Sequence, residues 1–412
     1  MAISSEEFSY FNRNKEKLYK LLVHCKLDIP YYSDKLDLPT FENFSFDFFR
    51  QRIPVLRKNI LRADSRILLD KHVKDEQLYT DATSGTEGKP ILCYRSKAEE
   101  FICSSTQWTC RRNFVSDLTP KDRFAHFYAF RDGKTGTISN RILYHGNEIL
   151  LPIFELSEQH LMHIWNEIFL FKPRWIHGTV SNLYGLAVVV NKFKLKRYSF
   201  DLIELVGEYV SDSQKEYIER TFGSPVAIQY GSREYWPIAY STKDGKLEVN
   251  SNVFIETISG PDGADNRLLI TLLKNDAWPL IRYDIGDCGL LHYDNEKIFV
   301  KLLKGRSAEF ISFSQGKIFN TIVFSSLIRK ICGASCNNVI RQYQVIKEDN
   351  DRISILLCTN PLVQKEDICQ QIKFELSKIL GEGIQIEVKL CDYIQPDSFT
   401  GKTKNFIDKT IV

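Results

Sequence analysis

The spacing of apolar residues predicts helices at the start of this 412-residue chain. Within residues 5–25 an apolar residue recurs every three or four positions, which makes one side of a helix hydrophobic. Residues 41–50 have a similar spacing, and a proline near the start of residues 52–61 favours another short helix. The residues on the apolar side of the first helix are Phe8, Phe11, Leu18, Leu21 and Leu22.

Between residues 123 and 232, strand-like runs alternate with helix-like runs. This βαβα order predicts an α/β sheet with parallel strands. Ligands of such sheets bind beyond the carboxyl ends of the strands, and the runs VGE (206–208) and QYGS (229–232) occupy such positions. The expected strands are 123–130, 174–178, 202–208 and 226–232, and the expected helices are 157–171, 181–193 and 211–223.

The pattern changes after residue 246. Short apolar runs separated by turns fill residues 246–303, which predicts a small β-barrel or an antiparallel layer. The segment after Gly305 has its own strand and helix signals, in the order β-β-α-β. We therefore expect a domain boundary near Lys304–Arg306, with an N-terminal domain over 1–303 and a C-terminal domain over 304–412.

Composition excludes several classes of protein. With 43% hydrophobic residues the chain can build a large core, and its net charge of +3 gives no indication of nucleic-acid binding. The first residues contain no apolar signal segment, and the longest apolar runs are too short to span a membrane. The ten cysteines form neither a disulfide framework nor a zinc motif. We expect a cytoplasmic protein with reduced thiols.

The stretch TDATSGTEGKPILCY (80–94) suggests phosphate binding. Its glycines let the backbone approach a ligand, and its N–H and hydroxyl groups can bind oxyanions. It is not a Walker loop, because Gly85 and Gly88 are too close together and Pro90 replaces the magnesium-binding hydroxyl. We expect a loop between a strand that ends near Leu78–Tyr79 and one that starts at Ile91. A surface hairpin turn is an equally good interpretation of this segment alone.

Three further stretches carry groups suited to a nucleotide. In QYGSREYW (229–236), Tyr230 offers a flat face, Gly231 a close backbone approach and Glu234 an oxygen ligand for magnesium. In WPLIRYDIGD (278–287), Asp287 can accept both hydroxyls of a ribose. In PDSFTGKTKNF (396–406), Lys402 follows a glycine. Taken singly, these stretches could equally be a strand-to-loop junction, a turn and a solvated basic tail.

Together the stretches resemble the adenylate-forming superfamily of acyl-CoA synthetases, nonribosomal adenylation domains and luciferases. The branch they resemble most is that of phenylacetate–CoA ligases and CapK-type capsule-biosynthesis proteins. The resemblance implies an α/β fold with a large N-terminal domain, made of two α/β subdomains and a small β-barrel, and a small mobile α+β C-terminal domain. The matching segments are TSGTEGKP (83–90), QYGSRE (229–234), PLIRYDIGD (279–287), KGRSAEFI (304–311) and FTGKTKNF (399–406), with IPYYSDKL (29–36) and RIPVLRKNIL (52–61) near the start.

The resemblance also implies an activity: a small carboxylic acid and MgATP give acyl-AMP and pyrophosphate, followed by transfer to CoA. Alternatives are transfer to an amine or hydroxyl, and a nucleotide-binding relative without turnover. Neither a nucleic acid nor a membrane is expected as a partner, and the oligomeric state stays open, with a homodimer among the alternatives. Catalytic roles are implied for Lys402 and for Glu234, which would also hold Mg²⁺.

The implied nucleotide contacts fall into three groups. The phosphate-binding residues are Ser84, Gly85, Thr86, Gly88 and Lys89. The residues around the adenine are Gly207, Glu208, Tyr230, Gly231 and Ser232, and the ribose-binding residues are Asp287 and Arg306. The residues near the acyl pocket are His177, Ser181 and Tyr184. Three residues depart from the family pattern: Glu87, Arg233 and Ala308.

Overall fold

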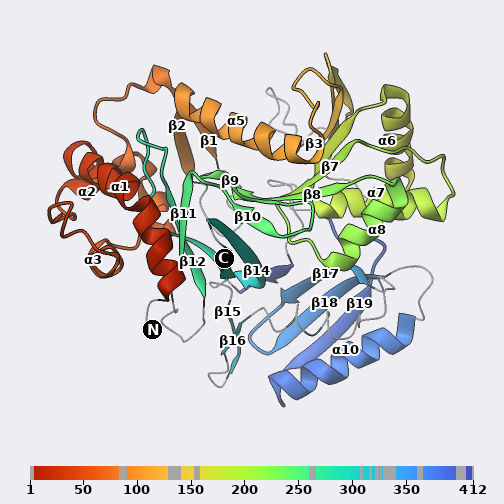
Figure 1. Cartoon of the computed structure of the whole chain (residues 1–412). Coiled ribbons are helices and arrows are strands. Elements are labelled where there is room, and N and C mark those ends of the chain that lie inside the picture. Colours follow the sequence, from red (N-terminus) through yellow and green to blue (C-terminus); the bar gives the residue numbers. More distant parts are fainter. Residues whose placement is uncertain are drawn as a thin grey trace. The chain divides into compact units, whose positions relative to one another are not determined.

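Figure 1 shows a computed structural model of the chain. It divides into two compact units: unit 1 holds residues 1–113 and 229–303, and unit 2 holds 114–228 and 304–412. The proposed boundary at 303/304 stays a prediction, because this division groups 114–228 with 304–412. The described residues are 4–82, 91–128, 141–152, 158–258, 266–294, 296–306, 310–314, 318–320, 324, 327, 340–359, 365–395 and 405–410.

Unit 1 begins with the long helix α1 (Ser5–Asp28), as the apolar spacing predicts. A capping box starts it, since Ser4 Oγ accepts from the Glu7 N–H while the Glu7 carboxylate accepts from the Ser4 N–H. The helix expected over 41–50 starts later, where Ser45 caps α3. The other helices of unit 1 are α2 (Pro30–Ser33), α3 (Phe46–Arg52), α4 (Lys58–Ala63) and α5 (Lys97–Phe114), the last of which was not expected.

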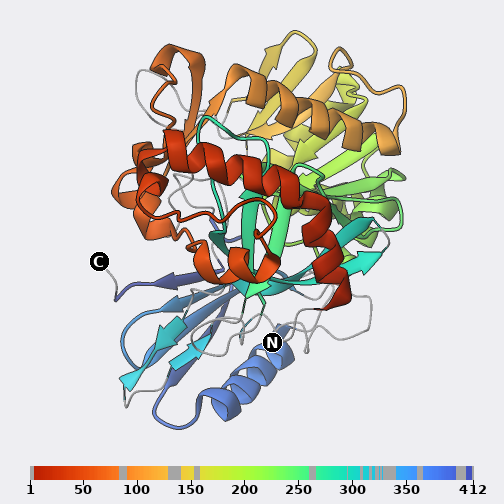
Figure 2. The same ribbon diagram turned by 60° about the vertical axis from the view of Figure 1, so that its left-hand side comes forward.

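The strands of unit 1 form a hairpin and an antiparallel layer. Helix α1 lies on the layer (Figure 2). Tyr10 Oη donates to the Val253 carbonyl at 3.1 Å, and the Tyr10 ring stacks on Phe254. The layer, in the order β11-β12-β13-β14-β10-β9, is the second of the two arrangements expected for 246–303. The strands are β1 (Leu78–Ala82), β2 (Leu92–Ser96), β9 (Trp236–Ser241), β10 (Leu247–Val249), β11 (Val253–Ile258), β12 (Arg267–Leu272), β13 (Tyr283–Asp294) and β14 (Lys297–Arg306).

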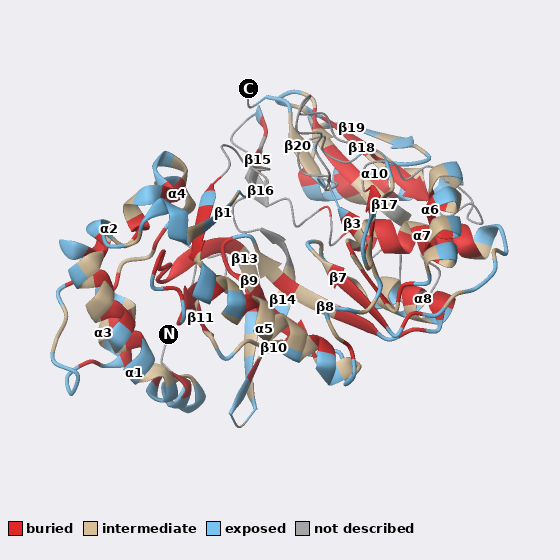
Figure 3. Cartoon of the chain, turned by 90° about the horizontal axis from the view of Figure 1, so that it is seen from above, coloured by how far each residue is buried: buried red, intermediate tan, exposed pale blue. Residues whose placement is uncertain are grey.

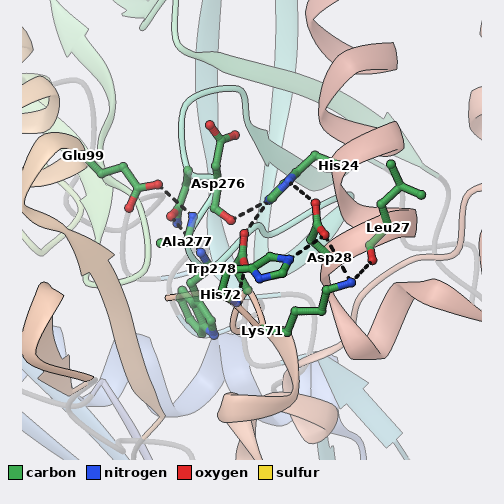
Figure 4. Close-up of polar contacts among 11 residues, drawn as sticks. His24, Leu27, Asp28, Lys71, His72, Glu99, Asp276, Ala277 and Trp278 are labelled. Carbon is green, nitrogen blue, oxygen red and sulfur yellow. Dashed lines mark hydrogen bonds and ion pairs between the residues drawn. The ribbon is translucent and has the colours of Figure 1, made fainter. Parts of the chain in front are cut away.

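A polar cluster ties α1 to distant segments of unit 1 (Figure 4). His24 contacts Asp28, Asp70 and the Asp276 carbonyl at 3.3, 3.4 and 2.9 Å. Lys71 Nζ lies 3.3 Å from Asp28 Oδ1. The next residue after Asp276, Ala277, donates its N–H to the buried carboxylate of Glu99 at 2.9 Å. These contacts fix the segment that leads into β13.

The first part of unit 2 has the expected alternation of strands and helices. Strands β5, β3, β6 and β7 pair in parallel in that order, with β4 antiparallel at the edge. Helix α7 is buried along most of its length (Figure 3). The elements are β3 (Phe124–Tyr128), β4 (Leu143–His145), β5 (Glu148–Pro152), α6 (Glu158–Phe171), β6 (Trp175–Gly178), α7 (Val180–Lys192), β7 (Leu202–Val206), α8 (Asp212–Phe222) and β8 (Val226–Ser232), within which the chain enters unit 1.

The last part of unit 2 has the expected β-β-α-β order as β17, β18, α10 and β19, and three further strands: the pair β15 and β16 before it and β20 after it. In the sheet β19-β18-β17-β20, Ile353, Ile355 and Leu357 of β18 point to a core that α10 covers with Ile368, Ile372 and Leu376. Among the described helices of the whole chain, none is long and apolar enough to cross a bilayer. The elements are β15 (Phe310–Ser312), β16 (Ile318–Asn320), β17 (Ile340–Lys347), β18 (Arg352–Thr359), α10 (Lys365–Leu380), β19 (Gln385–Leu390) and β20 (Phe406–Asp408).

Candidate active site

The proposed phosphate-binding stretch connects two paired strands. Strands β1 and β2 are antiparallel and bring Ala82 opposite Leu92, so the prediction of a strand on each side of this stretch is confirmed. The first strand lies further along than expected, since it runs from Leu78 to Ala82. The candidate residues Ser84, Gly85, Thr86, Gly88 and Lys89, together with Glu87, lie outside the described residues.

Arg95 joins the base of this hairpin to the QYGSRE motif. Its guanidinium is buried, donates to the Arg233 carbonyl at 2.8 Å and to the Glu100 carboxylate at 3.1 Å, and lies over the Trp236 ring. Arg233 in turn donates to the Asp81 carboxylate at 2.9 Å. Arg233, one of the departures from the family pattern, thus holds the strand that enters the loop. No local pattern in the sequence indicates this role of Arg95.

Glu234 is a buried carboxylate at the end of this motif. It is 5% exposed, and its Oε1 accepts a hydrogen bond of 3.0 Å from Tyr283 Oη. Burial and the neighbouring Glu234 charge both raise the pKa of Tyr283, so this tyrosine stays a hydrogen-bond donor. No Lys, Arg or His within the described ranges forms an ion pair with Glu234. A buried charge of this kind is costly unless a cation compensates it.

The surroundings of Glu234 fit a Mg²⁺ ion. The Oγ atom of Ser232 is buried and has no hydrogen-bond partner among the described residues, and it is a second oxygen near Glu234 in sequence. In the parts of the chain that the structure describes, no three His, Cys, Asp or Glu side chains gather as a metal site. Magnesium commonly uses one or two carboxylates and completes its shell with water and substrate phosphates, so a single protein carboxylate is sufficient.

Tyr230 and Asp287 lie together in unit 1. The Tyr230 hydroxyl donates to Asp287 Oδ2 at 2.9 Å and links β8 to β13. Asp287 follows Gly286, whose φ of +85° is a backbone conformation that residues with a side chain rarely adopt. The structure therefore joins the residue expected to stack on adenine to the one expected to bind ribose.

Gly231 has no room for a side chain. A Cβ atom at this position would lie 2.0 Å from the Trp236 carbonyl oxygen, because β8 and β9 approach closely here. Trp236 itself has a φ of +60°, which is strained for a tryptophan. The packing of β9 thus requires a glycine at position 231, and the approach of this backbone to a nucleotide stays a prediction.

Gly231→Ala is expected to lower the free energy of unfolding by roughly 3 kcal/mol, because backbone atoms must move to relieve the clash. Urea unfolding of the full chain measures this loss. Gly245→Ala is the matched control: its φ is +86° but a Cβ would meet nothing within 4 Å, so we expect about 1 kcal/mol. Equal losses in the two variants would show that the approach of β8 and β9 is not tight.

In unit 2, Glu208 caps a helix. Its Oε2 accepts from the Ser181 N–H at 2.9 Å and from the Ser181 hydroxyl at 2.7 Å, at the start of α7. A carboxylate is favourable there because the N-terminus of a helix carries partial positive charge. Gly207 has a φ of +75°, which turns the chain after β7 so that Glu208 reaches α7. The structure brings Ser181 and Glu208 together.

His177 is part of a row of ionisable side chains across the parallel strands. Its Nδ1 lies 2.5 Å from Oε2 of Glu204, which is fully buried on β7. Its ring lies edge-on to His126 of β3, with centroids 4.7 Å apart, and His126 Nδ1 lies 3.3 Å from Glu148 Oε1 of β5. Tyr184, the third residue expected at the acyl pocket, is buried in the core and packs on Tyr217.

Burial, and secondarily the His177 charge, lower the pKa of His126 despite its contact with Glu148. Below about pH 6.5, His126 therefore becomes protonated in the unfolded chain while it stays neutral in the folded chain. The free energy of unfolding falls as pH drops toward the pKa of the folded state. His126→Gln should reduce this loss, by up to about 1.4 kcal/mol per pH unit, in urea unfolding between pH 7 and 5. His145→Gln, at an exposed position on β4, should leave it unchanged. An identical pH profile in His126→Gln would contradict this prediction.

Several candidates cannot be placed. Arg306 lies in β14, but its side chain is outside the described part. Lys402 also lies outside the described residues, as do Ala308 and Glu309 of the segment KGRSAEFI (304–311). Sequence reasoning missed Tyr283 and Glu204, whose partners Glu234 and His177 are 49 and 27 positions away. Tyr283 is the first residue of β13 and Glu204 lies in the middle of β7, and neither position indicates its contact.

Comparisons with known proteins identify relatives of low identity. No protein-family model matches the chain. CapK of Staphylococcus aureus is 24% identical over 268 residues, which are 63% of this chain and 58% of CapK. The chain thus matches less than two thirds of the length of CapK. Indoleacetate–lysine synthetase of Pseudomonas savastanoi is 22% identical over 342 residues, which are 80% of this chain and 81% of that protein.

Among solved structures, 2-hydroxyisobutyryl-CoA ligase in its postadenylation state has a TM-score of 0.70 with this chain. The match covers 98% of this chain and 90% of the ligase, at 16% sequence identity. At this identity the likeness establishes a shared fold.

Proposed function

We propose that this chain, which has the fold of the adenylate-forming ligases, activates a carboxylic acid as an acyl-adenylate with release of pyrophosphate. The fold expected from the sequence is confirmed by the match to 2-hydroxyisobutyryl-CoA ligase over nearly the whole chain. One observation supports the activity above the others. The Tyr230–Asp287 pair and the buried Glu234 lie in one unit with the strands that flank the phosphate-type loop.

The proposed reaction forms one bond and breaks another. A carboxylate oxygen attacks the α-phosphorus of ATP, and the bond from that phosphorus to the bridging oxygen of pyrophosphate breaks. Charge builds on the phosphoryl oxygens, so catalysis depends on positioning and electrostatic stabilisation. Asp287, with Arg306, would hold the ribose, and Tyr230, Gly207 and Glu208 would surround the adenine.

Glu234 is the proposed protein ligand of Mg²⁺, with Ser232 beside it. When bound, the ion would neutralise negative charge on the phosphates. Tyr283 would hold the Glu234 carboxylate in one orientation through its hydrogen bond, and Arg95 would fix the backbone just before it. The loop residues Ser84, Gly85, Thr86, Gly88 and Lys89 would bind the β and γ phosphates.

The acceptor of the acyl group has two candidates. CoA is the first, since the solved structure that shares the fold over 98% of this chain is that of a CoA ligase. An amine is the second, since the relative that covers 80% of this chain is named a synthetase that joins indoleacetate to lysine. A phenylacetate-like acid, a role in capsule biosynthesis and a cytoplasmic location are further parts of the proposal. His177, Ser181 and Tyr184 are the proposed acyl-pocket residues.

A screen of pyrophosphate release tests this function. The full chain is incubated with MgATP and a panel of aryl, fatty, hydroxy and amino acids, each with CoA, with lysine or with neither. We expect one class of acid to raise release, and CoA or lysine to raise turnover further. Release that is independent of every acid, or formation of ADP in place of AMP, would contradict adenylation. ATP binding without any turnover would indicate a non-catalytic relative.

A further inference from the structure

Two cysteines of unit 2 lie side by side at the ends of neighbouring parallel strands. Register pairs Leu357 of β18 with Leu390 of β19, so the next residues, Cys358 and Cys391, are also neighbours. The Cys391 N–H donates to the Leu357 carbonyl at 2.9 Å, which extends this pairing. The two Sγ atoms are 3.3 Å apart, and both cysteines carry thiols that are not joined in a disulfide.

The backbone already has the spacing that a disulfide needs. Neighbouring strands of a sheet lie about 4.8 Å apart, which is within the range of Cα separations that disulfides span. Side chains alternate along β18, so Cys358 points away from the face on which Ile355 and Leu357 meet α10. Neither thiol therefore has to leave the hydrophobic core for the sulfur atoms to bond.

The two thiols differ in access to solvent. Cys358 is 1% exposed, whereas Cys391 is partly exposed where the chain leaves β19. Gln342 of β17 is the register partner of Cys358. Its Oε1 accepts a hydrogen bond of 3.3 Å from the Ile394 N–H. Burial of Ile394 further fixes the segment that follows Cys391. An oxidant should thus meet Cys391 first, with Cys358 held in contact behind it.

We propose that Cys358 and Cys391 are a modification site that a peroxide converts into an intrachain disulfide. The Cys391 thiolate attacks hydrogen peroxide, the O–O bond breaks, and the products are Cys391 sulfenic acid and, after protonation, one water. The Cys358 sulfur then attacks the sulfenic sulfur. The S–O bond breaks, the S–S bond forms, and the departing oxygen leaves as a second water with the Cys358 proton. In sum, two thiols and one peroxide give one disulfide and two waters.

Mass spectrometry of the reduced full chain after treatment with hydrogen peroxide tests this assignment. Remaining thiols are blocked with N-ethylmaleimide in denaturant, and trypsin separates Cys358 on peptide 353–365 from Cys391 on peptide 390–402. We expect these two peptides to be linked, with a mass two hydrogens below their sum. Cys369 on α10, a partly exposed thiol of the same unit, should remain available for blocking under the same dose.

Serine variants separate the two steps. In Cys358→Ser, Cys391 should stop at the sulfenic acid and be trapped by dimedone, a product that wild type should barely give. In Cys391→Ser, the buried Cys358 should remain a thiol and take up N-ethylmaleimide after unfolding. The assignment is wrong if wild-type Cys358 and Cys391 are both blocked as free thiols while Cys369 has been oxidised. It is also wrong if either residue is linked to a different cysteine.

Discussion

Lys402→Ala is expected to remove nearly all acid-dependent pyrophosphate release while ATP binding persists. A lysine is a compact charge on a flexible stem, suited to meeting the α-phosphate and the substrate carboxylate as they combine. Removing such a contact should slow adenylation by roughly 10²–10³-fold. ATP affinity should change little, because the 83–89 loop and Asp287 belong to the proposed N-terminal domain. Pyrophosphate release and calorimetric titration with ATP measure the two effects.

If CoA is the acceptor, Lys402→Ala should still convert supplied acyl-AMP to the thioester. Lys409→Ala is a matched control, since Lys409 is an exposed lysine of the same C-terminal segment that pairs with Glu348 at 2.6 Å. The control should release pyrophosphate at the wild-type rate. A wild-type rate in Lys402→Ala as well would mean that Lys402 is only a solvated tail residue.

Glu234→Gln is expected to lower adenylation by roughly 10²-fold, since the amide keeps the shape of the carboxylate but loses the charge that would bind Mg²⁺. The melting temperature should hardly move, because Gln can still accept the hydrogen bond from Tyr283. Pyrophosphate release as a function of Mg²⁺ concentration, together with thermal unfolding, measures both expectations.

Tyr283→Phe separates the charge of Glu234 from its orientation. It removes the hydrogen bond to Glu234 and leaves the carboxylate in place. We expect a smaller loss of adenylation than in Glu234→Gln, with the Mg²⁺ requirement retained. Near wild-type activity and Mg²⁺ dependence in Glu234→Gln would show that another group holds the metal.

Periodicity predicted most elements of the fold because most of them bury a regular apolar face. Helix α5 is one of the elements that it did not predict, since its buried residues are Glu99, Cys103 and Arg111 while Phe101 is exposed. Two of those three are charged, so the sequence of α5 has no apolar stripe to identify it. Their burial depends on partners in other segments. Glu99, for example, accepts a hydrogen bond from the Ala277 N–H. Such pairing cannot be read from a local pattern.

Candidate site residues could be predicted where one short motif contains the groups that suit a ligand. Contacts between segments that are far apart in the sequence could not be predicted. Tyr230, Glu234 and Asp287 could be proposed from glycines, carboxylates and strand ends. The buried Arg95 lies 138 positions from Arg233, whose carbonyl it holds, and nothing near Arg95 in sequence indicates that contact. The link from Glu208 to Ser181 was hidden for the same reason, because the turn at Gly207 creates it.

Oxygen transfer from the acid to AMP tests the central claim most directly. An active acid from the screen is labelled with ¹⁸O in both carboxylate oxygens and turned over with MgATP and its acceptor. If the carboxylate attacks the α-phosphorus, the recovered AMP carries one ¹⁸O atom and the pyrophosphate carries none. Unlabelled AMP, or label in inorganic phosphate accompanied by ADP, would contradict acyl-adenylate formation.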